Sequence, residues 1–289
     1  MPSYRRILVA TEYSPSSELA LETAVALATQ VGAELVVLHV FEQGGLAFPF
    51  PLPEGVRDAA RARLDQTVAG LRVRMLNASG VLREGAAWDQ ICTAAADLGA
   101  DLVVVGTQGR RGLPRWVMGS VAERVVRLSP VPVLTVRSSS DVAILAGGMD
   151  RFRHILAPTD FSEASRRGVE TATSLALDLG TSLTLAHVYE LPSAASYLFE
   201  GLAGEAEAEV GRLLEAELAR VRGRVPGVEG IVRRGDPWRG ILDAAKERSA
   251  DLVVMSTHGL HGLQRLLLGS VTEKIVRLSP IPVLTTGAR

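Results

Sequence analysis

Residues 101–136 read DLVVVGTQGRRGLPRWVMGSVAERVVRLSPVPVLTV, and residues 251–286 read DLVVMSTHGLHGLQRLLLGSVTEKIVRLSPIPVLTT. The two segments align without a gap, so Gly119 of the first corresponds to Gly269 of the second, an offset of 150 positions. A repeat of this length is a whole domain rather than one unit of a solenoid. The 289 residues are also enough for two domains of ordinary size. The chain is therefore predicted to consist of two similar domains.

Outward from the repeated segment, each half alternates apolar runs with amphipathic segments. The apolar runs are rich in Val, Ile and Leu throughout, which is typical of strands in a parallel sheet that helices cover on both faces. The sequence therefore predicts an α/β fold in each half, and the second half repeats the order of the first. In the first half the expected strands are residues 7–11, 34–41, 81–85, 101–107 and 131–137, and the expected helices are residues 16–32, 56–76, 87–100 and 120–129.

Helix caps and a polar segment mark the ends of these units. Ser14 and Ser162 follow the first strand of each half at N-cap positions, and Gly32 and Gly180 end the following helices as C-caps. Residues 138–150, SSSDVAILAGGMD, start with polar residues and end near glycines, which is typical of a linker. We predict a first domain at residues 1–140, a linker at residues 141–150 and a second domain at residues 151–289.

The composition excludes several classes of protein. A total of 31 basic and 32 acidic residues gives a formal net charge of -1, so no overall field attracts nucleic acid. Cys92 is the only cysteine, which excludes internal disulfides and CxxC zinc sites and favours a reducing compartment. Its apolar helical surroundings indicate a structural thiol. No apolar run reaches the roughly 18 residues that span a bilayer, and none resembles a signal peptide. We expect a cytoplasmic protein that binds neither nucleic acid nor membrane.

The loop after the fourth strand of each half has the strongest signal for ligand binding. In open parallel sheets, ligands bind beyond the carboxyl ends of the strands. Gly106 and Gly109 follow such a strand, and after nine further residues Gly119 and Ser120 open a helix. Glycines let backbone amides approach an anion, and a helix N-terminus adds unpaired donors and a partial positive charge. Three cations lie in the same loop, at Arg110, Arg111 and Arg115.

These features predict a site for two or three phosphates. The alternative interpretation is that the glycines serve only as turn and cap residues between strand and helix. The second half keeps Gly259, Gly262 and Gly269-Ser270 at the same offsets. This repetition favours the binding interpretation only modestly, because duplication preserves sequence for either reason.

The pattern G-x-x-G, nine residues, then G-S resembles the nucleotide loop of the universal stress protein family. The opening runs ILVATEYS and ILAPTDFS and the closing runs SPVPVLTV and SPIPVLTT are similar to the family as well. The likeness covers essentially the whole chain, as two family domains in tandem. It implies two Rossmann-like domains of the adenine nucleotide alpha hydrolase-like type, each with a five-stranded parallel sheet. It also implies binding of ATP or AMP, with Mg²⁺ or Mn²⁺ on the phosphates.

The resemblance also implies which residues hold the nucleotide. The acidic residue after the first strand, Glu12 in the first half and Asp160 in the second, would hold the ribose or adenine region. Val40 and Val188 would meet adenine through backbone groups, and the glycine loop would surround the phosphates. The expected cofactor-binding residues are Thr11, Glu12, Val40, Gly106, Gly109, Arg110, Gly119, Ser120 and Val121 in the first half, and Thr159, Asp160, Val188, Ser256, Gly259, Leu260, Gly269, Ser270 and Val271 in the second.

Each half departs once from the family's pattern. Glu12 stands where the family usually has Asp, and its extra methylene moves the carboxylate by about 1.5 Å, which leaves direct contact with the ribose open. Ser256 replaces the first loop glycine. If that position requires a positive φ, a serine there would cost about 1 kcal/mol or more. We expect both halves to bind nucleotide with unequal affinity, and the sequence leaves open which half binds more tightly.

The sequence offers little for catalysis. His258 and His261 flank Gly259 but have no counterpart in the first half, so we interpret them as solvated loop residues. The sequence contains no phosphate loop with its lysine, no HExxH and no GxSxG motif. His39 and His187 lie within apolar strands and are interpreted as core histidines. We expect no catalytic residues, no metal site made by protein ligands, and at most a slow ATPase activity.

Three functions stay open at this point. The leading one is an adenine-nucleotide-binding stress-response or signalling protein whose nucleotide state sets its shape or partners. The others are a nucleotide-independent interaction scaffold and a slow ATP hydrolase. The resemblance suggests that the closing strands of the two halves pair with each other, so that the chain resembles a covalent dimer. A homodimer of the whole chain and the identity of a protein partner stay open.

Overall fold

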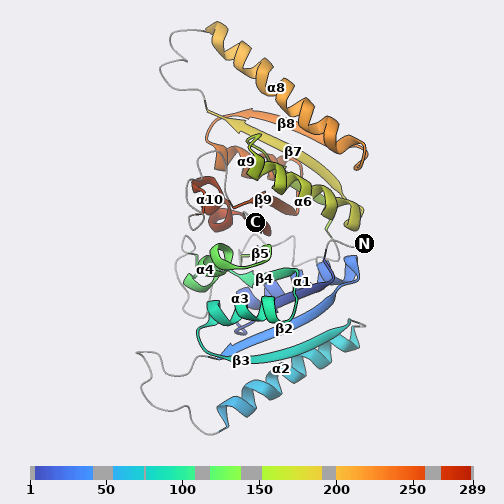
Figure 1. Ribbon diagram of the computed structural model, residues 1–289, viewed down its shortest axis with the longest axis vertical. Coiled ribbons are helices and arrows are strands. Elements are labelled where there is room, and N and C mark those ends of the chain that lie inside the picture. The colour runs from blue at the N-terminus through green and yellow to red at the C-terminus, as the bar shows by residue number, and fades with distance from the viewer. Residues whose placement is uncertain are drawn as a thin grey trace. The chain divides into compact units, whose positions relative to one another are not determined.

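The computed structural model in Figure 1 describes residues 4–41, 55–74, 76–107, 118–137, 152–190, 200–257 and 268–287. The chain divides into two compact units, Met1–Arg151 and Phe152–Arg289. The predicted linker at residues 141–150 lies outside the described residues, so its boundaries stay a prediction.

The first unit is a parallel sheet with helices between its strands. The strand order is β3-β2-β1-β4-β5, and every neighbouring pair is parallel. This confirms the predicted five-stranded parallel sheet. In chain order the elements are β1 (Arg6–Ala10), α1 (Pro15–Val31), β2 (Glu34–Phe41), α2 (Val56–Val73), β3 (Ala78–Glu84), α3 (Ala87–Asp97), β4 (Leu102–Gly106), α4 (Ser120–Leu128) and β5 (Val133–Val136).

The second unit repeats this topology. Its strand order is β8-β7-β6-β9-β10, again with parallel pairs throughout. In chain order the elements are β6 (His154–Pro158), α6 (Glu163–Leu179), β7 (Ser182–Tyr189), α8 (Glu200–Arg222), β8 (Glu229–Arg234), α9 (Pro237–Glu247), β9 (Leu252–Ser256), α10 (Ser270–Leu278) and β10 (Val283–Thr286).

The strand order creates a switch point in each sheet. The chain moves outward from β1 to β3, then returns to the other side of β1 as β4. Because such crossovers are right-handed, α1 and α2 cover one face of the sheet and α3 and α4 cover the other. Ligands of open α/β sheets bind where the order reverses, beyond the carboxyl ends of the two central strands. In this protein those strands are β1 and β4 in the first unit, and β6 and β9 in the second.

The predicted caps of the first helices are confirmed. Ser14 and Ser162 have extended backbone, and their side chains accept the amides of the third helical residues. Gly32 and Gly180 end these helices with φ of 72° and 62°, in the left-handed region that glycine adopts without strain.

The strand β3 begins three residues earlier than the sequence pattern indicates. Its first residues are small, which conceals the strand from a search for apolar runs, yet Ala78 pairs with Leu35 in the ladder. Gly80 has a reason to be small, because a Cβ there would lie 3.0 Å from Leu64 Cγ and from Val68 Cγ2 of α2. The same contact recurs in the second unit, where Gly230 lies against α8.

The glycine that ends β4 is required for space rather than for its backbone conformation. Neither Gly106 nor its counterpart Ser256 has a positive φ, so a serine at this position carries no backbone strain. A Cβ on Gly106 would instead lie 2.5 Å from Ser16 Oγ and 2.8 Å from the Ser16 carbonyl oxygen of α1. In the second unit the glycine is on the helix. Gly168 of α6, which corresponds to Ala20, lies so close to β9 that a Cβ would be 2.9 Å from Ser256 N.

Gly106→Ser should therefore destabilise the first unit, although a serine occupies the same place in the second. We expect a loss of about 1–3 kcal/mol, the usual cost of forcing extra atoms into a packed interior. Hydrogen exchange of β4 peptides in increasing urea measures this loss within one unit. Gly70→Ala is the matched control, because a Cβ on Gly70 of α2 would meet nothing within 4 Å. Equal protection in Gly106→Ser and the unaltered chain would show that α1 shifts without cost.

Candidate functional site

The carboxyl ends of the two central strands bring most of the described candidate residues together. Thr11 and Glu12 follow β1, and β1 pairs with β4, which ends at Gly106. The pairing of β1 with β2 ends at Ala10 and Leu38, two residues before Glu12 and Val40. In the second unit Thr159, Asp160, Val188 and Ser256 have the corresponding places. Four of the predicted residues lie outside the described ranges, namely Gly109, Arg110, Gly259 and Leu260.

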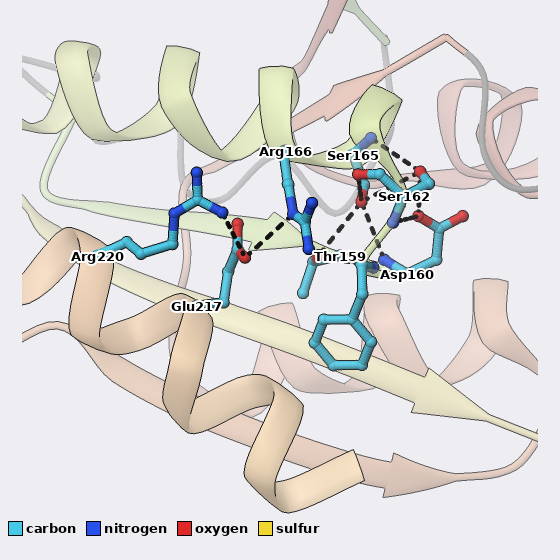
Figure 2. A network of polar contacts seen from close by, with 8 residues as sticks. Thr159, Asp160, Ser162, Ser165, Arg166, Glu217 and Arg220 are labelled. Carbon is cyan, nitrogen blue, oxygen red and sulfur yellow. Dashed lines mark hydrogen bonds and ion pairs between the residues drawn. The ribbon is translucent and has the colours of Figure 1, made fainter. Parts of the chain in front are cut away.

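A network of hydrogen bonds holds the carboxylate that follows β6 (Figure 2). The hydroxyl of Ser162 donates to Asp160 Oδ1 at 2.5 Å, and the amide of Ser162 donates to the same oxygen at 3.1 Å. The same hydroxyl oxygen accepts the amide of Ser165 at 3.1 Å, which caps α6. Ser165 Oγ in turn lies 3.2 Å from Thr159 Oγ1 and accepts the amide of Asp160 at 3.3 Å. The acidic side chain is thus oriented by the first turn of the helix.

The first unit builds the same turn around a longer side chain. The hydroxyl of Ser14 donates to Glu12 Oε1, so the extra methylene of Glu12 does not break the contact. The amide of Ser17 donates to Ser14 Oγ at 3.3 Å and completes the cap. The amide of Ser14, however, donates to Ser17 Oγ at 3.0 Å rather than to the carboxylate.

An aromatic residue in a strained conformation follows each carboxylate. Tyr13 has a φ of 61° and Phe161 a φ of 63°. Bulky side chains rarely adopt the left-handed region, and a residue held there costs of order 1–3 kcal/mol. Such strain persists only where the surrounding structure holds the residue in this conformation. Both units maintain the strained turn at the same position.

A buried histidine supports the strained turn. His187 Nδ1 donates to the carbonyl of Thr159 at 2.7 Å, and its ring stacks on Phe161 with centroids 4.4 Å apart. His39 Nδ1 makes the same 2.7 Å bond to the carbonyl of Thr11. Both histidines are buried, so their interpretation as core residues is confirmed. Their contacts on both sides of the acidic residue show that this core position also shapes the candidate site.

The cofactor-binding residues predicted from the sequence did not include the aromatic residue and the two serines of this turn. The two halves share the pattern Thr, acid, aromatic, Ser, two residues, Ser, at residues 11–17 and 159–165. Both serines and the aromatic residue take part in the network or the strained turn, and their identical spacing in the two halves is the signal that could have identified them.

The side chains packed near the turn interact differently in the two units, through ion pairs in the second and a cation–π contact in the first. Glu217 of α8 has a side chain only 7% exposed, and its Oε2 lies 3.5 Å from Arg166 Nε and 3.8 Å from Arg220 Nη1 (Figure 2). In the first unit Arg63 of α2 instead stacks its guanidinium over the Tyr13 ring, 3.9 Å from the centroid. Because a buried carboxylate is costly unless it is paired, the two arginines compensate for the burial of Glu217 in the second unit.

The helices that follow the glycine loops begin without a side-chain cap. The amide of Gly119 donates to the carbonyl of Thr107 at 2.7 Å, and the amide of Gly269 makes the equivalent 2.9 Å bond to Thr257. These two amides therefore close the ends of their loops. The first helical residues are Ser120 and Val121 of α4 and Ser270 and Val271 of α10, whose amides have no partner within an α-helix.

The position of Ser256 has its own support in the second unit. Ser256 is buried, and its carbonyl accepts the hydroxyl of Thr272 at 3.1 Å. The corresponding residue of the first unit is Ala122, which has no hydroxyl. The end of β9 is thus tied to the first turn of α10 by a side chain that the first unit lacks.

Other candidate chemistry is limited in the part of the chain that the structure describes. Burial, with a smaller contribution from Asp89, raises the pKa of the Cys92 thiol to about 11, which suits a structural thiol. No three His, Cys, Asp or Glu side chains within the described ranges gather as metal ligands. Among the same residues, no helix is long and apolar enough to cross a membrane.

Burial also makes the second unit sensitive to acid. It lowers the pKa of His187 below the ordinary value, while the bond to the Thr159 carbonyl and the charge of Asp160 act in the opposite direction. A histidine with a lowered folded-state pKa stabilises the fold above its unfolded pKa of about 6.5, and this contribution is lost as the pH falls through the folded value.

We therefore expect His187→Gln, which keeps an N–H donor but does not titrate, to flatten the loss of stability between pH 7.5 and 5. One histidine accounts for a slope of at most about 1.4 kcal/mol per pH unit. Hydrogen exchange of β6 and β7 peptides across this pH range measures it. His154, whose pKa burial also lowers, is present in both proteins and contributes equally. Parallel profiles for the two proteins would contradict the assignment.

Comparison with known proteins identifies the family. The model of the Universal stress protein family matches residues 3–137 and again residues 151–286. A universal stress protein of Mycolicibacterium smegmatis is 28% identical over 309 aligned residues, which cover 98% of this chain and 97% of that protein. One of Mycobacterium tuberculosis is 33% identical over 195 residues, or 64% of this chain, and the match spans only 61% of that relative's length.

A solved structure supports the same conclusion for the fold. The crystal structure of a universal stress protein from Archaeoglobus fulgidus has a TM-score of 0.74 and 23% sequence identity, and the match covers 98% of both chains. The two family-model matches together account for nearly the whole sequence. The chain therefore belongs to the universal stress protein family and carries the domain of that family twice.

Proposed function

We propose that each half of the chain binds an adenine nucleotide, ATP or AMP, at the carboxyl edge of its sheet. The carboxylate after the first strand, Glu12 or Asp160, would hold the nucleoside. The uncapped first turn of α4 or α10 would hold the phosphates. The observation that carries the proposal is the serine-held carboxylate, which both units place at the switch point of the sheet.

The carboxylate at one end of the proposed site and the helix N-terminus at the other suit the two ends of a nucleotide. A carboxylate accepts hydrogen bonds from ribose hydroxyls or the adenine amino group, and the amides of a helix N-terminus together with its dipole attract phosphate. Ser120 and Ser270 are exposed at the start of their helices and would add hydroxyl donors. Mg²⁺ or Mn²⁺ would bind through phosphate oxygens, since such ions commonly bind nucleotides with few protein ligands.

Both departures from the family pattern have a structural compensation. Glu12 still reaches the N-cap serine of its helix. Ser256 is buried at the end of β9, where Gly168 provides the close approach that Gly106 provides in the first unit. These observations support two sites per chain rather than one site and a degenerate copy.

The number of ATP molecules bound per chain tests this proposal. Calorimetric titration of nucleotide-free protein with ATP and Mg²⁺ should give two per chain, with GTP much weaker. Glu12→Gln and Asp160→Asn should each weaken one site by tenfold or more, because a hydrogen bond to a charged group contributes about 1.5–3 kcal/mol. Glu34→Gln, at the opposite edge of the sheet, is the matched control and should bind like the unaltered chain.

Two results would support the alternatives. No binding at millimolar ATP would leave a nucleotide-independent interaction scaffold as the better interpretation. Phosphate release that is absent from the double variant Glu12→Gln/Asp160→Asn would instead indicate an ATP hydrolase.

A charge placed at the start of α4 and α10 tests the phosphate end separately. Ser120→Asp/Ser270→Asp should weaken ATP binding at both sites, because a carboxylate would stand where the phosphates are expected. The fold should be unaffected or slightly more stable, since an acidic residue in the first turn complements the helix dipole. Adenosine, which has no phosphate, should bind equally to the variant and the unaltered chain. Equal ATP affinity in both proteins would place the phosphates elsewhere.

A further inference from the structure

The N-cap serine of each half uses one hydroxyl to accept a helix amide and to donate to the carboxylate, while the second serine of the turn lies farther from it, with Oγ–Oγ distances of 3.5 Å to Ser17 and 3.3 Å to Ser165. In the second half Ser162 Oγ accepts the amide of Ser165 and donates to Asp160 Oδ1 (Figure 2). The oxygen of a hydroxyl can accept while its single hydrogen donates, so the two contacts are compatible. The first half repeats the arrangement with Ser14 and Glu12.

We propose that Ser14 and Ser162 are positioning residues, whose hydroxyls fix the nucleotide-binding carboxylates and so set the affinity for nucleotide. This role rests on the proposed function, because it concerns the same carboxylates. It differs from helix capping, which concerns the stability of α1 and α6 and does not require the hydroxyl hydrogen.

The hydroxyls would act by preorganising the acidic side chains. Glu12 and Asp160 are only partly buried, and a carboxylate at such a place must lose side-chain entropy when it binds a ligand. A hydrogen bond that already holds the carboxylate reduces this loss, which is the basis of preorganisation. Ser14 is 4% exposed, so its hydroxyl is directed within the protein rather than toward solvent.

The two halves should depend on the hydroxyl to different extents. Ser162 also donates its amide to Asp160 Oδ1 at 3.1 Å, so this bond survives removal of the hydroxyl. The amide of Ser14 is directed to Ser17 Oγ at 3.0 Å, so Ser14 holds Glu12 through its hydroxyl. Removal of the hydroxyl therefore leaves one bond from Ser162 to Asp160 but none from Ser14 to Glu12.

Substitutions at these positions can separate positioning from capping. Glycine is nearly as good an N-cap as serine but has no hydroxyl. Threonine is a good N-cap and keeps the hydroxyl. Aspartate is a good N-cap that cannot donate and places a second negative charge beside the carboxylate.

The test compares Ser14→Gly/Ser162→Gly with Ser14→Thr/Ser162→Thr and the unaltered full chain, by calorimetric titration with ATP and Mg²⁺. Both halves are changed together, so the result does not depend on which half binds more tightly. We expect the glycine pair to bind ATP about tenfold more weakly, as for loss of a hydrogen bond to a charged group. The threonine pair should restore most of the affinity. Thermal unfolding should show similar midpoints for all three proteins.

Three other outcomes would contradict the positioning role of Ser14 and Ser162. A glycine pair that binds as tightly as the unaltered chain would remove the positioning role and leave nucleotide binding intact. A threonine pair as weak as the glycine pair would show that the hydroxyl does not matter. If the unaltered chain bound no ATP, the proposed function and this role would fail together.

If the glycine pair is less stable than the unaltered chain, a second variant tests the positioning role. Ser14→Asp/Ser162→Asp keeps an acceptor for the capped helix amide, but its charge next to Glu12 or Asp160 should lower the unfolding midpoint, so its binding is measured well below that midpoint. It should also bind ATP at least as weakly as the glycine pair, because it removes the donor and repels the carboxylate. Tight binding by this variant would overturn the proposal.

Discussion

Parallel pairing of the two central strands is the constraint on which each candidate site depends. It brings together two loops that are far apart in the sequence and aligns their ends at one edge of the sheet. Aspartates anchor the opposite edge of this pairing. Asp101 accepts the amide of Arg5 at 2.8 Å, and Asp251 accepts that of Arg153 at 2.8 Å, so the first and fourth strands of each unit start in a fixed register. The carboxylate turn and the end of the fourth strand then lie at the other edge of the same sheet.

Much of this arrangement could be predicted from the sequence, because it follows from periodicity and local rules. Apolar runs separated by amphipathic segments predicted the parallel sheet, and Ser14 and Gly32 marked the ends of α1 correctly. The strained turn is harder to predict. Local bonds contribute to it, because the amides of Tyr13 and Phe161 donate to Thr11 Oγ1 and Thr159 Oγ1, but the aromatic rings also contact a histidine from the neighbouring strand, which local rules do not reveal. The turn thus depends on tertiary contacts as well as on local ones.

The exchange of glycines shows why a position judged alone can mislead. Ser256 differs from the family pattern, and a comparison with Gly106 alone suggests a damaged loop. The structure shows that a close approach of helix and strand is kept in both units, with the glycine on β4 in one and on α6, at Gly168, in the other. The requirement belongs to the pair of elements, because interiors are close-packed and either partner can provide the missing volume. Duplication followed by divergence leaves such compensations, which no single copy reveals.

A further difference between the halves lies behind the turn that carries the carboxylate. In the first unit Arg63 stacks on the aromatic ring of the turn, whereas in the second a buried Glu217 pairs with Arg166 next to Ser165. Cation–π contact and a buried ion pair differ in how they respond to salt and to loss of one partner. The proposed binding residues differ between the halves at Glu12 and Asp160 and at Gly106 and Ser256, and the residues packed behind the turn differ as well. The supporting structure is therefore a source of unequal affinity in addition to the substitutions at Glu12 and Ser256.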